Sequence, residues 1–119
     1  MQFEETAKMN LLFDFYGGLL TEKQRLIFRS YYEDDLSLAE IADNIQISRQ
    51  GVHDALRKAS ASLEEHESKL CLIRRFKNVG DIAGRAKAEI DRVLAEHPDD
   101  AGLETRLRSV RAMIDKLEE

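Results

Sequence analysis

Proline, cysteine and tryptophan are almost missing from this 119-residue chain, which has one proline, one cysteine and no tryptophan. A single cysteine, Cys71, excludes an intrachain disulfide and favours a reducing compartment. No apolar run approaches the roughly 20 residues that a membrane-spanning helix requires. Acidic residues near the N-terminus stand where a signal peptide carries positive charge. We therefore expect a cytoplasmic protein that does not insert into a membrane.

Alternating polar and β-branched runs, the pattern of a half-buried strand, are nearly absent too. Most windows instead repeat apolar residues at spacings of three and four, which is typical of amphipathic helices. The only proline is Pro98, so long stretches lack a helix breaker. Apolar residues make up 43% of the chain, which is enough for a core. The predicted fold class is all-α.

Positive charge is also scarce. The chain has 18 Lys and Arg residues and 23 Asp and Glu residues, which gives a net charge of −5. This is the wrong sign for a protein that coats nucleic acid without regard to its sequence. By region, residues 1–20 sum to −2, residues 21–78 to zero and residues 79–119 to −3. The balance implies no strong salt-dependent binding, but it allows local contact with phosphates.

The neutral middle contains two basic stretches, one at residues 49–58 and one further on. The second carries four bases with no acid between them: Lys69, Arg74, Arg75 and Lys77. With Phe76 interleaved, it suits phosphate contact and base stacking in RNA. A solvated helix face is the favoured interpretation, with Phe76 in the core because it keeps helical spacing from Ile73.

Two amphipathic helices are predicted before residue 33. The first runs from about Glu4 to Tyr16 and is broken by Gly17-Gly18. Its apolar face holds Met9, Leu12, Phe13 and either Phe15 or Tyr16. Thr21 and Gln24 have the spacing of a capping box, so the second helix is expected from Glu22 to about Tyr32. It would bury Leu26, Ile27 and Tyr31.

The most informative segment is Leu36–Ala59, which reads LSLAEIADNIQISRQGVHDALRKA. Ser37 and Glu40 form another capping-box pair, which opens a first short helix. The turn would hold Asp43 to Ile47, and Ser48 would cap the next helix. Two helices with so short a connection cross steeply, which is the geometry of a helix-turn-helix.

The apolar positions of this segment also fit the core of any three-helix domain: Leu38, Ile41, Ala42, Ile45, Ile47, Val52 and Leu56. Two details favour the helix-turn-helix, since Ala42 is small where helices must approach closely and Ile47 is an apolar anchor just before an N-cap. In that motif the second helix carries side chains into the DNA major groove. The candidates here are Arg49, Gln50, His53, Arg57 and Lys58. Arginine pairs well with guanine and glutamine with adenine at base edges.

After Ser48 no helix-terminating residue appears until Val79-Gly80. The sequence therefore predicts one helix of about 30 residues, about 45 Å long. Asp81 opens a further segment that ends at His97-Pro98. A last segment alternates spacings of four and three: Leu103, Leu107, Val110, Ile114 and Leu117. The predicted organisation is a helical domain at residues 1–78 and a C-terminal helical extension at residues 79–119. The extension would form a hairpin that packs on the long helix or on a partner chain.

Other candidate sites are weak. The run Glu33-Asp34-Asp35 fits a polar interhelix loop better than a metal or acid–base cluster, because adjacent carboxylates do not converge. The histidines, His53, His66 and His97, are too scattered for zinc. Cys71 is expected as a small buried hydrophobe. No Ser/His/Asp or Cys/His set is present, so we expect no catalytic residue, metal or cofactor, and no enzyme.

Several stretches resemble known families. SLAEIADNIQISRQGVHDALRKA is similar to the helix-turn-helix of bacterial sigma factors in their fourth region and of related response-regulator domains, and LTEKQRLIFRSYYEDDLSLAEIA extends the likeness upstream by one helix. More specifically, MNLLFDFYGGLLTEKQ, YYEDDLSLAEIA and SRQGVHDALRK occur in this order and together resemble the YlxM family of small bacterial proteins. These blocks cover about Lys8 to Lys58, and the C-terminal residues carry no matching motif.

The resemblance implies a helix-turn-helix domain of sigma region-four type and a link to the signal recognition particle pathway. It makes Ser48, Arg49, Gln50, His53 and Arg57 the base-reading candidates. Two positions depart from the pattern. Gln46 occupies a turn position often held by glycine, so the backbone there must adopt the αL conformation at a cost, or the turn differs. Asp54 places a negative charge on the recognition helix.

Two functions from different classes remain open. The first is a regulator of transcription that binds DNA, as a homodimer if the half-sites are related by a twofold axis, with the long helix and the last heptads supplying the dimer contact. The second is an interaction module that keeps the fold but engages protein or RNA of the signal recognition particle. The net charge and Asp54 favour the second, whereas Arg49, Gln50 and Arg57 on one helix place the first slightly ahead.

Overall fold

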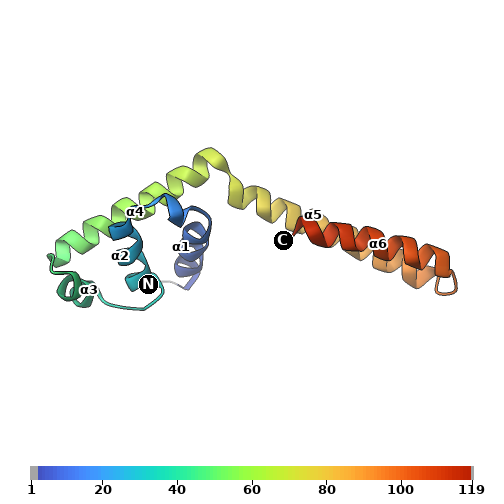
Figure 1. Ribbon diagram of the computed structural model, residues 1–119, viewed down its shortest axis with the longest axis horizontal. Helices are drawn as coiled ribbons and strands as arrows, with labels where there is room; N and C mark the ends of the chain where they lie inside the picture. Colours follow the sequence, from blue (N-terminus) through green and yellow to red (C-terminus); the bar gives the residue numbers. More distant parts are fainter. Residues whose placement is uncertain (1–2, 119) are drawn as a thin grey trace. The chain divides into compact units, whose positions relative to one another are not determined.

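The computed structural model describes residues 3–118 (Figure 1), which form six α-helices and one short 3-10 helix, with no strand among them. The helices are α1 (Phe3–Tyr16), the 3-10 helix η1 (Gly17–Leu19), α2 (Glu22–Tyr32), α3 (Leu38–Ile45), α4 (Arg49–Leu70), α5 (Leu72–Glu96) and α6 (Ala101–Leu117). The predicted all-α class is confirmed. Among the described residues, no helix is both long and apolar enough to cross a membrane.

The chain divides into two units after Ile73, which is five residues before the predicted boundary at residue 78. We call residues 1–73 the helix-turn-helix unit and residues 74–119 the hairpin unit. Because α5 begins at Leu72, the division falls within the first turn of that helix.

In the helix-turn-helix unit, α4 packs against α1, α2 and α3. The centre of the core is an aromatic stack in which the rings of Phe13 and Phe28 lie 4.8 Å apart and nearly parallel. Tyr32 continues this stack, 4.6 Å from the Phe28 ring. A β-carbon on Gly17 would lie 3.0 Å from the Phe13 ring, so a glycine lets the chain turn closely at the end of α1.

The predicted bounds of the first two helices and both capping boxes are confirmed, whereas α3 continues to Ile45, three residues into the turn that was predicted at Asp43 to Ile47. Thr21 and Gln24 exchange hydrogen bonds of 3.0 and 3.1 Å between side chain and backbone at the start of α2, as the capping box requires. The predicted buried face of α2 is partly wrong, because Leu26 is 52% exposed and Phe28 is fully buried instead. At 3.6 residues per turn, the face that Ile27 and Phe28 share turns Leu26 toward solvent.

The predicted single helix from Ser48 to Val79-Gly80 is wrong. It ends at Leu70, and Cys71 adopts a left-handed conformation with φ 55° and ψ 30° before α5 begins. Gly80 instead lies inside α5. Cys71 is half-buried and its thiol donates to the Ser68 carbonyl at 3.8 Å, so it ends a helix rather than filling the core.

A buried tyrosine stabilises this break. Tyr16 is only 1% exposed. Its hydroxyl donates to Glu67 Oε1 at 2.5 Å and accepts from the Leu72 N–H at 3.1 Å. Glu67 Oε1 also accepts from the Ile73 N–H at 3.0 Å. These two amides belong to the first turn of α5, where no intrahelical partner exists. Burial, followed by the hydrogen bond to Glu67, raises the pKa of Tyr16 above its ordinary value.

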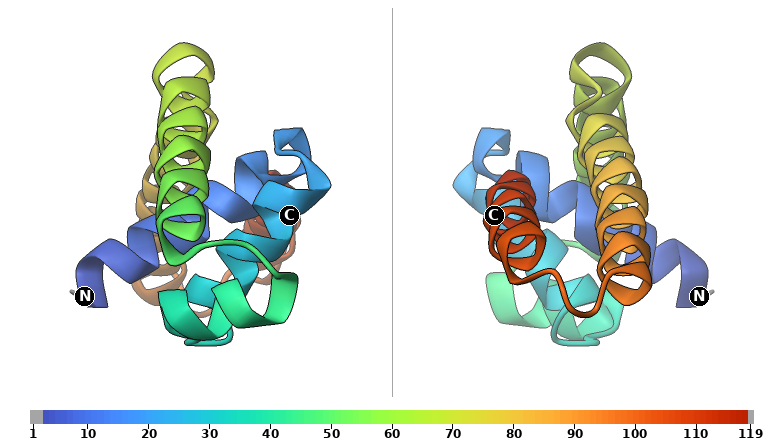
Figure 2. Two further views of the ribbon diagram at one scale, coloured as in Figure 1. Left: turned by 90° about the vertical axis from the view of Figure 1, so that its left-hand side faces the viewer. Right: turned by 90° about the vertical axis from the view of Figure 1, so that its right-hand side faces the viewer.

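The hairpin unit consists of residues 74–96 of α5 and the antiparallel helix α6, joined by a short loop (Figure 2, right). Asp100 caps α6 by accepting from the Leu103 N–H at 3.0 Å. Only Ala83 and Ile90 are buried among the described residues of this unit, and α6 buries none. The expectation that Phe76 lies in the core is wrong, since it is 52% exposed.

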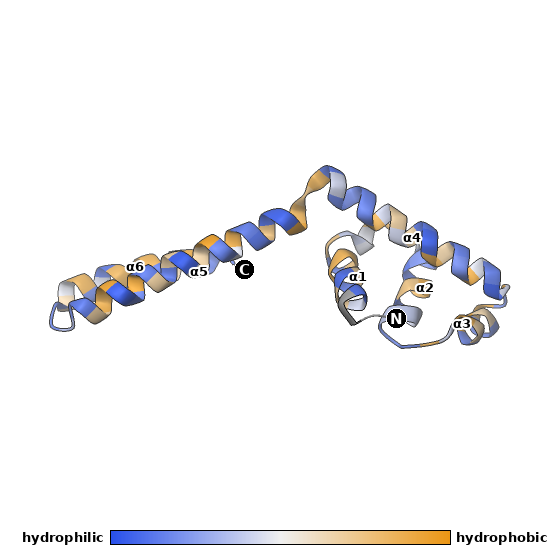
Figure 3. Cartoon of the chain, turned by 180° about the vertical axis from the view of Figure 1, so that it is seen from behind, coloured by the Kyte–Doolittle hydropathy of each residue, from blue (hydrophilic) through white to orange (hydrophobic). Residues whose placement is uncertain are grey.

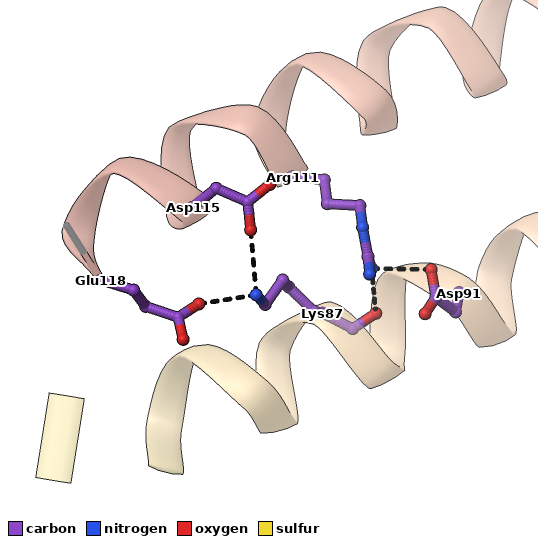
Figure 4. A network of polar contacts seen from close by, with 5 residues as sticks. All are labelled: Lys87, Asp91, Arg111, Asp115 and Glu118. Carbon is purple, nitrogen blue, oxygen red and sulfur yellow. Dashed lines mark hydrogen bonds and ion pairs between the residues drawn. The ribbon is translucent and has the colours of Figure 1, made fainter. Parts of the chain in front are cut away.

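Charged contacts join the two helices of the hairpin (Figure 4). Lys87 Nζ lies 2.9 Å from Asp115 Oδ1 and 2.6 Å from Glu118 Oε1. Arg111 donates to Asp91 Oδ1 at 2.8 Å and to the Lys87 carbonyl at 3.3 Å. Hydrogen bonds from Lys87 hold the pKa of the Asp115 carboxyl below its ordinary value. The two helices are thus linked by ion pairs as much as by apolar contact.

Candidate nucleic-acid interface

The first helix of the motif, α3, is fixed at both ends. Ser37 and Glu40 form the reciprocal capping box, each bond 3.1 Å long. At the other end Gln46 adopts the left-handed conformation, with φ 60° and ψ 45°, as its place in the turn requires. Its side chain donates to the Asp43 carbonyl at 2.9 Å, which offsets part of the backbone cost. The next residue, Ile47, donates its N–H to the Ala42 carbonyl at 3.2 Å.

The second helix, α4, starts at the turn (Figure 2, left). Its N-cap is Ser48, whose hydroxyl oxygen accepts from the Gly51 N–H at 2.9 Å. No glutamate reciprocates because the third position is Gly51, as the sequence predicts. The Ser48 hydroxyl therefore has a structural role, and its proton stays available to donate to a phosphate or base.

The remaining predicted site residues all reach solvent from the first three turns of α4. Exposed side chains belong to Arg49, Gln50, His53, Arg57 and Lys58. The opposite side of the same turns is buried by Val52, Leu56 and Ala59. Within residues 3–118, no ion pair engages Arg49, Arg57 or Lys58. The structure thus presents three uncompensated cations beside one amide and one imidazole.

Asp54, the acidic residue in the first three turns of α4, contacts two neighbouring side chains. Gln50 Nε2 donates to Asp54 Oδ1 at 3.1 Å. The His53 Nδ1 atom lies 3.7 Å from the same oxygen, which makes an ion pair only when His53 is protonated. The Asp54 side chain is 46% exposed, so its carboxylate meets solvent as well as these two residues. It also fixes the Gln50 amide, which must leave Asp54 to pair fully with an adenine edge.

Two surface hollows flank the start of α4, and composition alone does not predict them. One is lined by Leu38, Arg49, Gln50 and His53. The other is lined by Tyr31, Tyr32, Leu38, Leu56, Ser60, His53 and Arg57. Both share Leu38 and His53, so the polar side chains of α4 border apolar and aromatic surface from α2 and α3. The sequence pattern placed Leu38 in the core, whereas it is half-buried at the rim of both hollows.

Negative charge limits the basic surface on α4. Glu64 and Glu65 are exposed one to two turns beyond Lys58. Each already has a cation, because Glu64 lies 3.1 Å from Lys8 and Glu65 lies 2.9 Å from Lys69. The whole helix-turn-helix unit carries thirteen acids and eight bases, so it holds the full net charge of −5. The cations of α4 that lack an ion pair within the described residues therefore all lie in its first three turns.

The second basic stretch does not form one helix face. The break at Cys71 leaves Lys69 at the end of α4, paired with Glu65, and places the other three bases in α5. Those are Arg74, Arg75 and Lys77, all exposed. The expected continuous basic face is therefore absent among the described residues.

Comparison with known proteins places the chain in a family. The model of the family described as "UPF0122: Putative helix-turn-helix protein, YlxM / p13 like" matches residues 3–97. A UPF0122 protein of Bacillus mycoides is 41% identical over 115 residues, which cover 97% of this chain and 98% of that protein. One from Halalkalibacterium halodurans is 46% identical over 89 residues, or 75% and 82% of the two chains. The resemblance predicted from the sequence is confirmed, and the chain belongs to this YlxM / p13-like family of helix-turn-helix proteins.

Proposed function

We propose that this protein binds duplex DNA and reads its sequence with the N-terminal turns of α4. The observation that carries the proposal is the set of exposed, unpaired cations on the second helix of a helix-turn-helix. Arg49 and Arg57 are two turns apart on α4 and have no acidic partner among the described residues. Arginine on such a helix donates two hydrogen bonds to the major-groove edge of guanine.

The side chains that we propose as DNA contacts have different roles; they are Ser48, Arg49, Gln50, His53, Arg57 and Lys58. Arg49, Gln50 and His53 lie at the helix N-terminus, which is the part of a recognition helix that meets base edges. Ser48 and Lys58 at the two ends of the set suit phosphate contact. The N-terminal amides of α4 also favour an anion, because Ser48 satisfies only one of them.

Binding is expected to be weak on unrelated DNA. Non-specific affinity comes from neutralised phosphates, and the helix-turn-helix unit has five more acids than bases. The few cations on α4 act against this background of repulsion. Sequence preference would therefore come from base contacts, and a role in regulating transcription follows from such a preference.

Selection from a random duplex library tests this proposal. The full chain should enrich a short motif at moderate salt, and affinity for that motif should exceed affinity for a scrambled duplex by at least about tenfold. A library that shows no enrichment over many rounds, with equal binding to the scrambled duplex, would contradict it.

The acidic balance of residues 1–73 favours a second function, an interaction module that binds a protein or RNA instead of DNA. The link to the signal recognition particle that the family resemblance implies belongs here, and it stays a prediction because no described residue bears on it. A chain that enriches no duplex, yet needs Arg49 and Arg57 for a purified RNA or protein ligand, would support this alternative.

A further inference from the structure

An apolar strip runs along one side of the hairpin unit and is not covered within the described residues. On α5 it includes Val79 and Ile82, which are 40% and 62% exposed. On α6 it includes Val110, Met113 and Leu117, which are 42%, 64% and 67% exposed. The two residues on α5 are three positions apart, and those on α6 are three and four positions apart. Each group therefore lies on one side of its helix. Figure 3 shows hydrophobic residues recurring along both helices of the hairpin.

The ion pairs that join α5 and α6 lie on another side of the two helices. Lys87 and Asp91 on α5 pair with Asp115, Glu118 and Arg111 on α6 (Figure 4). These residues follow spacings of three and four on a different stripe from the apolar strip. A partner for the strip therefore needs apolar surface and no particular charge.

We propose that this strip binds the same strip of a second copy of the chain, so that two hairpins form an antiparallel four-helix bundle. A twofold axis makes one patch serve both partners, and a strip spread over two antiparallel helices meets its own copy in this way. The described residues of the hairpin bury only Ala83 and Ile90, and pairing would enlarge this small core.

Charge favours a second copy as the occupant. The hairpin unit has ten acids and ten bases and is neutral, so two hairpins approach without net repulsion. The helix-turn-helix unit carries the full −5, so two such units repel each other.

The exposed area favours an occupant. The five apolar side chains of the strip are each 40–67% exposed, which leaves an apolar patch on the order of a few hundred Å² per chain, and a monomer rarely exposes a larger one. A standard stable interface takes about 800 Å² from each partner, so polar side chains that border the strip would supply the rest of the contact.

Solution mass across a dilution series tests the pairing, measured on the full chain by light scattering and sedimentation. We expect twice the chain mass of 13.7 kDa at high concentration, and loss of the dimer by at least about tenfold in dissociation constant for Ile82→Glu and, separately, Met113→Glu. Both side chains are more than half exposed, so helical content should stay at the wild-type level.

Ala95→Glu is the matched control, because Ala95 is exposed on α5 about 140° around the helix from Ile82. It should leave the dimer intact. A wild-type chain that stays monomeric at every concentration would overturn the proposal. So would a dimer that survives both strip variants, or one that Ala95→Glu disrupts equally. The outcome is independent of DNA binding, since no DNA is present.

Discussion

Residues 1–73 bury fourteen apolar side chains in one cluster, whereas the described part of residues 74–119 buries only Ala83 and Ile90. The first unit is acidic and the second is neutral. In the first, caps and an aromatic stack fix each helix against the others. In the second, ion pairs link two helices that leave an apolar strip open. The first unit is therefore closed around its own core, whereas the second leaves apolar side chains exposed.

The largest effect that separates the two units is a core deletion. Phe28→Ala should lower the free energy of unfolding of the helix-turn-helix unit by about 3–5 kcal/mol, because it removes the fully buried ring between Phe13 and Tyr32. Leu26→Ala, at an exposed neighbouring position, should cost under about 1 kcal/mol. Urea denaturation measures both. Equal losses would mean that α2 buries a different face.

A smaller effect is expected from the contact at the end of α4. Tyr16→Phe leaves Glu67 and the Leu72 N–H without their shared hydroxyl, so the melting temperature should fall by roughly 5 °C. Tyr31→Phe is the control, since Tyr31 is half-buried but its hydroxyl has no hydrogen bond within the described residues. Thermal unfolding followed by circular dichroism compares them. A similar melting temperature for both variants would show that the contact does not stabilise the break.

The position of the helix break gives a third test. Cys71→Gly should stabilise the chain by about 0.5–1 kcal/mol, because a left-handed residue suits glycine. Gly80→Ala should stabilise it by a similar amount, because Gly80 is helical and a β-carbon there meets no atom within 4 Å. Chemical denaturation measures the change. If one helix ran through Cys71 and stopped at Gly80, both substitutions would be destabilising.

The smallest effect concerns the ion pairs of the hairpin. Hydrogen bonds that Lys87 donates to Glu118 and Asp115 raise the pKa of Lys87, and the same bond to Asp115 lowers the pKa of Asp115. The carboxyl therefore stabilises the fold above its ordinary pKa and loses this effect as the pH falls through its lower folded value. The ammonium stabilises the fold below its ordinary pKa and loses this effect as the pH rises through its raised folded value. The full contribution lies between about pH 5 and pH 10.

Lys87→Met should accordingly change the melting temperature by no more than about 2 °C at neutral pH, because the two carboxylates that pair with Lys87 are 35% and 56% exposed and solvent weakens such ion pairs. The change should shrink at pH 3 and at high salt. Lys77→Met is the control on the same helix, since Lys77 is exposed and has no ion pair among the described residues. A change that persists undiminished at pH 3 would contradict the assignment.

Much of the helix-turn-helix unit could be predicted because its signals are local. Thr21 with Gln24, and Ser37 with Glu40, specify helix starts within three residues, and the structure has both capping boxes. The left-handed Gln46 is one of the two alternatives that its place in the turn allows, and the structure has it. These features depend on neighbours in sequence, so spacing alone finds them.

The features that spacing did not predict depend on contacts between distant residues. The break at Cys71 interrupts no apolar period, and its stabilising hydroxyl comes from Tyr16, more than 50 residues earlier. The exposure of Leu26 depends on which ring Phe28 meets in α1. The hollows beside α4 need Leu38 and the tyrosines of α2 to be placed first.

The central claim is that the acidic helix-turn-helix unit reads DNA with the start of α4. The most direct test compares the affinity of the selected duplex for wild type and for the Arg49→Ala, Arg57→Ala double variant. Lys69→Ala, which removes an already paired cation at the far end of the same helix, is the matched control. We predict that the double variant binds at least about tenfold more weakly than wild type and has a shallower salt dependence, while Lys69→Ala binds as wild type does. Equal affinity of the double variant and wild type at every salt concentration would contradict the account.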